Sequence, residues 1–299
     1  RLYVLRAVNF GQSQWLVVLD PTTGTRLDSL AVPVGFAQRV EVASDGSALF
    51  LVGPGLGVLA VDPVTLDTIY SLPEGKTADS IPWQSVAVAV ARDHPGRLAV
   101  LRGPTAPSAS GWQVRLIQNG VVLPDLFEVP LDAGPLALGF VPGDSVLVAL
   151  TANRSSGAHF RRLSVGPSGL AMTLDAAVTI ATGYDLVVSG GVVFTDQYGV
   201  LDVATGAVLA ASIDVSPGQA VAPGRSGTRA YVARQYTWNG DPVTQIDRLG
   251  ASAGSPLGTI SLPRVVGPAI TGITTWGTDG IAFGGSQQLL IVTSDRTSE

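Results

Sequence analysis

One short hairpin pattern recurs along the 299-residue chain and constrains the fold more than any other feature of the sequence. An apolar strand ends in Asp, a turn with Thr-Gly follows, and a second strand leaves the turn. The clearest copies are LVVLDPTTGTRLDSLAVP (16–33), LAVDPVTLDTIYSLP (59–73) and VLDVATGAVLAASIDV (200–215). Weaker copies lie at 114–130, 160–178, 244–263 and 289–295. A pattern that returns about every 46 residues indicates a repeat architecture.

A second type of hairpin alternates with the first. Its best copy is VEVASDGSALFLV (40–52), in which Asp45-Gly46 separates two apolar strands. Asp-Gly and Gly-Gly favour tight hairpins, because such turns require positive φ. Counterparts lie at 88–101, 136–150, 184–195, 219–233 and 270–283. The repeating unit is therefore predicted to have four antiparallel strands, with a loop of variable length between the second and the third.

Four-stranded units in series predict an all-β fold, a seven-bladed β-propeller in which each blade covers a face of the next. We expect a single propeller domain over residues 1–299. The first and last blades are expected to be incomplete, because the first lacks an innermost strand and the last an outermost one. The expected blades are 1–33, 37–73, 84–131, 134–178, 182–215, 218–263 and 267–295.

Two segments carry a resemblance to a known family. SDGSALFLV together with LAVDPVTLDTIYSL resembles the YVTN-type repeat of bacterial surface and periplasmic propellers, a distant relative of WD40 repeats. The closing TTWGTDGIAFGGSQQLLIVTSD is similar to the last blade of propeller modules in large bacterial surface proteins. The resemblance implies a propeller that is part of a larger, multidomain, secreted or cell-surface protein. It implies no particular activity, because propellers host many functions.

Composition narrows the class of partner. The formal net charge is −5, and the 18 basic residues include a single lysine, Lys76, and form no basic run. Nucleic-acid binding requires clustered Lys and Arg, so we expect none. No apolar run is long enough to span a membrane as a helix. The absence of Cys excludes disulfides and thiolate metal sites, and it favours an extracytoplasmic location: secreted, periplasmic or cell surface.

Four long segments are predicted on the propeller face that carries the loops between second and third strands and between blades. They are PEGKTADSIPWQ (73–84), RGPTAPSASGW (102–112), TANRSSGAH (151–159) and RQYTWNGDP (234–242). Their aromatic, Arg and Asn side chains suit a protein or glycan partner. The candidate ligand-binding residues are Arg102, Arg154, Tyr236, Trp238 and Asn239. The alternative for Trp15, Trp83 and Trp112 is packing between blades.

The sequence contains few residues suited to acid–base chemistry. It has two histidines, His94 and His159, and most aspartates occupy turns, where they form local hydrogen bonds. We therefore predict no catalytic residue, no metal site and no cofactor. The favoured function is a non-enzymatic binding or scaffolding module with its partner on the long-loop face.

Two other functions remain open. Lactonase-type propellers resemble the chain in repeat style and imply a metal-dependent hydrolase or lyase, with Glu, Asn and Asp around a divalent metal at the channel mouth. Glu74, Asn153, Asp185 and Asp196 are of the right types, but their spacing does not single them out. The other alternative is a structural spacer without a ligand.

Overall fold

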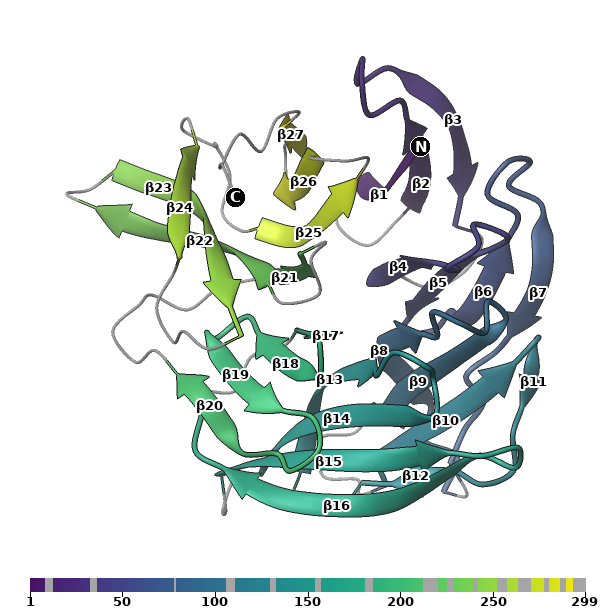
Figure 1. The fold of residues 1–299 in the computed structure, drawn as a ribbon. Helices are drawn as coiled ribbons and strands as arrows, with labels where there is room; N and C mark the ends of the chain where they lie inside the picture. Colours follow the sequence, from purple (N-terminus) through teal and green to yellow (C-terminus); the bar gives the residue numbers. More distant parts are fainter. Residues whose placement is uncertain are drawn as a thin grey trace. The chain divides into compact units, whose positions relative to one another are not determined.

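The computed structural model describes residues 1–8, 13–32, 37–77, 79–105, 111–129, 133–153, 157–180, 185–211, 220–224, 229–238, 241–251, 257–262, 270–276, 280–285 and 289–292. These residues form strands joined by turns (Figure 1). The chain divides into two compact units, Arg1–Leu147 with Leu163–Thr173, and Val148–Arg162 with Leu174–Glu299. Within the described ranges, no helix has the length and apolarity needed to cross a membrane.

The first unit contains three complete sheets. One consists of β1 (Leu2–Val8), β2 (Ser13–Leu19) and β3 (Arg26–Ala31). The next consists of β4 (Arg39–Val42), β5 (Leu49–Gly53), β6 (Gly57–Val61) and β7 (Thr68–Leu72). The third consists of β8 (Trp83–Val90), β9 (Arg97–Pro104) and β10 (Gln113–Gln118), with an outer strand split into β11 (Val121–Val122) and β12 (Phe127–Glu128).

The fourth sheet has residues in both units, and the last three lie in the second unit. The fourth consists of β13 (Ala133–Phe140), β14 (Val146–Asn153), β15 (Gly157–Val165) and β16 (Leu170–Val178). The fifth consists of β17 (Leu186–Ser189), β18 (Val192–Thr195), β19 (Gly199–Asp202) and β20 (Val208–Ala211). The sixth consists of β21 (Ala220–Pro223), β22 (Arg229–Trp238), β23 (Asp241–Gly250) and β24 (Gly258–Leu262). The last consists of β25 (Ile270–Trp276), β26 (Gly280–Gly285) and β27 (Leu289–Val292).

Within each sheet the strands pair in chain order, so the predicted four-stranded antiparallel unit is confirmed. The expected count of seven blades is wrong, because the structure supports six. Four sheets have four strands, one has a split outer strand, and the first and last sheets have three strands each among the described residues. Among the described residues, the sheets β1–β3 and β25–β27 are therefore not complete four-stranded units.

The recurrent Asp turn forms for a local reason. Asp20 Oδ1 accepts hydrogen bonds from the backbone N–H groups of Thr22 and Thr23, at 2.7 and 3.3 Å. Asp62 Oδ1 accepts in the same way from Val64 and Thr65, at 2.7 and 2.8 Å. These hydrogen bonds favour the ionised carboxylate, so the pKa of both aspartates lies below its ordinary value. The repeated Asp therefore fixes the turn between the third and fourth strands.

The core lies along the middle strands of each sheet. β5 and β6 are buried at every position, whereas the outer strand β7 alternates between exposed and half-buried residues. The two faces of β5 belong to different clusters: Phe50 packs with Val58 and Leu98, and Leu51 packs with Leu16 and Leu59. A strand covered on both faces needs a continuous apolar run, which LFLV supplies.

The outer edge of the third sheet is tied to the following turn. Asp125 N donates to Ser168 O (2.8 Å) and Leu170 N donates to Asp125 O (2.9 Å), between β11 and β12. Gly169 lies between these bonds with φ +146°, and a Cβ there would be 1.9 Å from Asp125 O. Only glycine fits so close an approach, so the split of the outer strand follows from this contact.

Candidate binding surface

Two of the predicted long loops meet at one end of sheet β8–β12. Trp83 N donates to Gly75 O at 3.3 Å, and Thr105 N donates to Pro82 O at 3.0 Å. The segment that precedes β8 therefore lies beside the end of β9. The described parts of segments 73–84 and 102–112 therefore lie side by side at Pro82 and Thr105.

Glu74 holds this end of the sheet in place. Its Oε2 accepts a hydrogen bond from Gly55 N at 3.0 Å, and its Oε1 accepts one from Ser85 N. Its backbone carbonyl accepts a third bond, from Arg102 Nη1 at 3.1 Å. Glu74 thus joins the β5–β6 turn, the start of β8 and the end of β9. A carboxylate engaged in this way acts as a structural anchor.

Arg102 is fixed rather than free. Its Nη2 donates to Gln113 Oε1 at 2.8 Å, and its guanidinium carbon lies 4.3 Å from the centroid of the Trp83 ring. Arg102 is 6% exposed and its Nε is buried without a hydrogen-bond partner. Among the described residues no carboxylate forms an ion pair with it. The cation is stabilised by a carbonyl, an amide and an aromatic face.

Trp112 completes this surface. A Cβ on residue 103 would lie 2.3 Å from carbons of the Trp112 ring, so the indole lies directly over Gly103. Trp112 remains partly exposed, whereas Trp83 is buried at 8%. Trp83 thus has the environment of a packing residue. We call Glu74, Trp83, Arg102, Trp112 and Gln113 the Arg102 surface.

The prediction of a loop over residues 234–242 is wrong. This segment is not a loop but the end of a long hairpin, because β22 pairs with β23 as far as Trp238 opposite Asp241. The segments RAYVARQYTW and DPVTQIDRLG are rich in residues that favour strands, and Asn-Gly between them is the sequence of a two-residue hairpin turn. Tyr236 lies within β22, half-buried.

Arg234 repeats the arrangement of Arg102 in the second unit. Its Nη2 donates to Gln245 Oε1 at 2.7 Å, and its guanidinium carbon lies 5.0 Å from the centroid of the Tyr236 ring. In both sheets the Gln stands directly opposite the Arg in the register, 11 residues later in the chain. The sequence contains this shared Arg–Gln spacing, but the prediction of candidate site residues did not include either Gln.

A buried carboxylate distinguishes the second copy. Asp247 is fully buried and accepts hydrogen bonds from Tyr198 Oη at 2.6 Å and Thr259 Oγ1 at 2.5 Å. Arg234 Nε lies 2.7 Å from Asp247 Oδ2, an ion pair without the alignment of a hydrogen bond. We call Tyr198, Arg234, Tyr236, Gln245, Asp247 and Thr259 the Asp247 network. Because Asp247 is buried and its carboxylate is bound by side chains of the same unit, this network stabilises the fold.

The remaining predicted site residues are only partly described. Arg154 and Asn239 lie outside the described residues, and Trp238 is described only by its place at the end of β22.

In the fourth sheet, His159 Nδ1 lies 2.7 Å from Asp175 Oδ1, and Arg161 Nε donates to Asp175 Oδ2 at 3.2 Å. Arg161 also donates to Thr151. Asp175 thus binds the His159 and Arg161 side chains through its two carboxylate oxygens.

The described residues give no support to a metal site. No group of three or more His, Asp or Glu in the described ranges lies close enough to hold a metal ion. Of the residues considered for a lactonase-like site, Glu74 is engaged as described above. Asp185 Oδ2 accepts a hydrogen bond from Val221 N at 3.2 Å, which ties the fifth sheet to the sixth.

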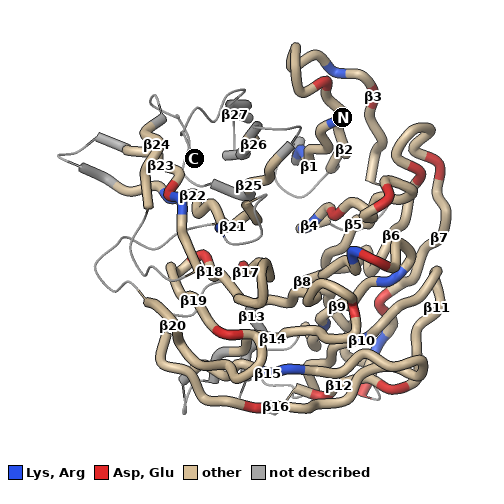
Figure 2. Tube along the Cα trace, viewed as in Figure 1, with Lys and Arg blue, Asp and Glu red and all other residues tan. Residues whose placement is uncertain are grey.

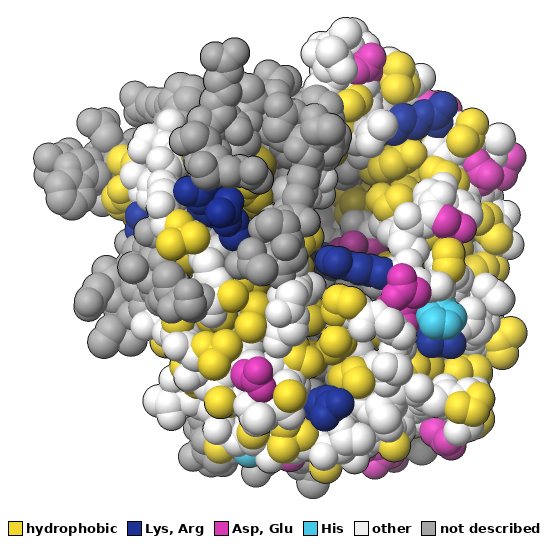
Figure 3. All heavy atoms as spheres, viewed as in Figure 1, with side chains coloured by type: hydrophobic (Ala, Val, Ile, Leu, Met, Phe, Trp, Pro, Cys, Tyr) yellow, Lys and Arg dark blue, Asp and Glu magenta, His cyan; other side chains and the backbone are white. Residues whose placement is uncertain are grey.

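The Lys and Arg residues are spread over many strands, and their side chains form separate groups on the face drawn (Figures 2 and 3).

Comparison with known proteins identifies the fold. No protein-family model matches the chain, and no curated protein matches it. Among solved structures, the RRP9 WD40 repeats have a TM-score of 0.61 and 14% identity, over 87% of this chain and 82% of that chain. The β-propeller domain of Myceliophteria thermophila Cps50 (Swd1) has a TM-score of 0.63 and 12% identity, over 97% and 95%. The chain has a WD40-like β-propeller fold.

A bacterial structure is also similar to this propeller. A functionally unknown protein from Desulfotomaculum acetoxidans has a TM-score of 0.71 and 14% identity, over 97% of this chain and 92% of that one. At such identities the likeness shows the fold alone, so the expected β-propeller with four-stranded antiparallel blades is confirmed.

The stability of the protein at alkaline pH is expected to depend on two tyrosines, the half-buried Tyr70 and the buried Tyr198. Burial raises the pKa of Tyr70 from 10.0 to about 12, and burial together with the hydrogen bond to Asp247 raises the pKa of Tyr198. Above pH 10 the unfolded chain loses these protons and the folded chain keeps them. Stability is therefore complete below pH 10 and falls as pH rises towards the folded values, by roughly 1 kcal/mol per pH unit for Tyr198 and by less for the half-buried Tyr70.

Urea denaturation at about pH 9 and about pH 11 tests this expectation, because the linkage operates only above the ordinary tyrosine pKa. The wild-type protein should lose more stability between the two conditions than the double variant Tyr70→Phe, Tyr198→Phe. Equal losses would show that neither phenol is protected from ionisation in the folded state.

Proposed function

We propose that this propeller is a non-enzymatic binding or scaffolding module whose partner docks on the Arg102 surface. One observation carries the proposal: a partly exposed Trp112 ring lies over Gly103, beside an arginine that three contacts hold in place. Trp and Arg are the residue types that dominate binding energy at protein interfaces. A rigid surface of this composition loses little conformational entropy when a partner binds.

The other parts of the proposal come from the sequence. Arg154, Tyr236, Trp238 and Asn239 are proposed as further ligand-binding residues, and the partner is a protein or a glycan. The two compact units are proposed to be parts of one propeller domain of the YVTN type, carried by a larger extracytoplasmic bacterial protein. The absence of Cys and the repeat segments support this assignment.

The role of Trp112 is testable with selected peptides. Peptides are selected from a random library on the folded protein and then titrated by calorimetry against the wild type and Trp112→Ala. We expect the loss of the indole to weaken binding about tenfold or more, as at interface residues that dominate binding. The matched control is Val121→Ala, which removes an exposed apolar side chain from the outer strand β11.

Circular dichroism accompanies the titrations. Peptides that bind Trp112→Ala as tightly as the wild type would contradict the proposal, and so would a variant that loses its β-sheet spectrum, because Trp112 would then be a core residue. A parallel glycan array separates the two partner classes. Binding to glycans that Trp112→Ala abolishes would assign the surface to a sugar.

A further inference from the structure

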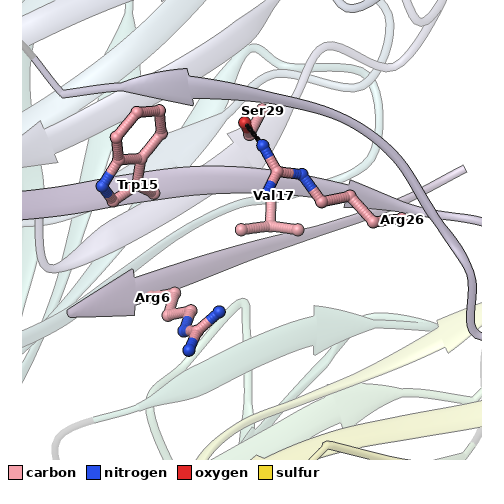
Figure 4. Close-up of a pocket in the computed structure, with 5 residues that line it drawn as sticks. All are labelled: Arg6, Trp15, Val17, Arg26 and Ser29. Carbon is pink, nitrogen blue, oxygen red and sulfur yellow. Dashed lines mark hydrogen bonds between the residues drawn. The ribbon is translucent and has the colours of Figure 1, made fainter. Parts of the chain in front are cut away.

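A small pocket lies on the face of the first sheet that does not enter the core. It is lined by Arg6, Trp15, Val17, Arg26 and Ser29, with a volume of about 140 Å³. Along β2 the side chains alternate, so Leu16 and Val18 are fully buried while Trp15 is 37% exposed. Figure 4 shows the Trp15 ring and Val17 in the middle, with Arg26 and Ser29 on one side and Arg6 on the other.

The strand register explains why these residues share one face. Arg6 stands opposite Trp15 in the β1–β2 pairing, and Ser29 stands opposite Val17 in the β2–β3 pairing. Arg26 is the first residue of β3, where a register shift between Val18 and Leu19 displaces it, and its Nη2 donates to Ser29 Oγ (Figure 4). Three adjacent strands thus place two guanidinium groups around an indole and a valine.

All charged residues that line the pocket are cationic. Its lining contains two arginines, one hydroxyl and no carboxylate. In the part of the chain that the structure describes, no carboxylate forms an ion pair with Arg6 or Arg26. The chain as a whole has a net charge of −5, so this cationic lining contrasts with the overall charge. An anion is the chemical complement of such a site, since arginine forms two parallel hydrogen bonds with a carboxylate.

We propose that this pocket binds an acidic side chain of a protein partner. The carboxylate lies between Arg6 and Arg26, and an apolar residue next to it in the partner contacts Trp15 and Val17. The volume favours this occupant, because pockets for cofactors and other small molecules have about 300–1,000 Å³, whereas a single side chain needs far less. The inference goes beyond the proposed function, because it concerns a different surface and names the chemistry of the partner.

The experiment uses the full chain and two short peptides. Acetyl-Gly-Glu-Phe-Gly-amide is the probe, and the same peptide with Gln in place of Glu is its uncharged control. Labelling with 5-fluorotryptophan gives one ¹⁹F signal for each of the five tryptophans, and the signal of Trp15 is assigned by its loss in Trp15→Phe. The affinity is read from the shift of that signal on titration.

We expect the Glu peptide to shift the Trp15 signal and the Gln peptide to bind about tenfold or more weakly. Arg6→Gln and Arg26→Gln should each weaken binding of the Glu peptide by a similar factor. The matched control Arg92→Gln removes the charge of an exposed arginine in the β8–β9 turn and should leave binding unchanged.

Three results would overturn the inference. The Gln peptide could bind as well as the Glu peptide, the two pocket variants could behave like Arg92→Gln, or the Trp15 signal could lack a solvent isotope shift in D₂O, which would mean that the face is covered. None of these results bears on Trp112. Failure here is therefore distinguishable from failure of the proposed function.

Discussion

Asp247→Ala is expected to lower the free energy of unfolding by about 3–5 kcal/mol, because it removes one member of a buried ion pair and leaves the other uncompensated. Asp247 is fully buried, and Arg234, Tyr198 and Thr259 all direct polar atoms at its carboxylate. Without that carboxylate, the Arg234 side chain, which is 13% exposed, has no ion pair with any of the described residues. Urea denaturation measures the difference.

The control for this variant is Asp67→Ala. Asp67 is exposed on the turn before β7, and no side-chain hydrogen bond of it is seen in the described residues, so we expect a change within about 0.5 kcal/mol. Tyr198→Phe removes one donor to Asp247, and in a double-variant cycle with Asp247→Ala it should show a coupling of about 1 kcal/mol or more. A loss below about 1 kcal/mol in Asp247→Ala would mean that the network does not form in solution.

Asp144→Ala is expected to lower the free energy of unfolding by about 2–4 kcal/mol, because two backbone donors lose their acceptor. Asp144 is fully buried in the β13–β14 turn. Its carboxylate accepts hydrogen bonds from Arg92 N at 2.9 Å and Asp93 N at 2.5 Å, in the β8–β9 turn. A hydrogen bond in the opposite direction joins the same two turns, because Asp93 Oδ2 accepts from Gly143 N at 2.9 Å.

Two further variants test the mechanism. Asp144→Asn keeps one acceptor oxygen and should recover about half of the loss. His94→Ala is the control for the third contact of Asp144, a distance of 3.1 Å from His94 Nδ1 to Asp144 Oδ2. Because the His94 side chain is 45% exposed, its loss should matter little. If His94→Ala were as destabilising as Asp144→Ala, the backbone donors would not be the cause.

These two aspartates show where reading the sequence fails. Asp45, Asp62 and Asp202 hydrogen-bond to residues two or three positions away, as turn aspartates were expected to do. Asp144 and Asp247 bond to residues about 50 positions away. A local sequence pattern predicts the hydrogen bonds within a turn. It does not predict the hydrogen bonds between distant residues, because those partners depend on how the sheets pack.

The site residues divide in the same way. The sequence placed Arg102 and Trp112 near the same loop, because both flank the segment 102–112. It did not show that Gln113 fixes the guanidinium or that Gly103 makes room for the indole, since both facts depend on side-chain direction in paired strands. The segment 234–242 was wrongly predicted as a loop, although Asn-Gly between strand-forming residues indicated a hairpin.

The sequence by itself determined the strand units and their order. Apolar alternation and turn chemistry act over a few residues, and they specify which segments become strands and where each hairpin turns. Only the tertiary structure decided which Arg and Asp side chains are buried, where the outer strand of the third sheet divides, and that Trp15 and two arginines share a pocket. These features arise because burial and pairing depend on residues far away in the chain, whose positions follow from the packing of whole sheets.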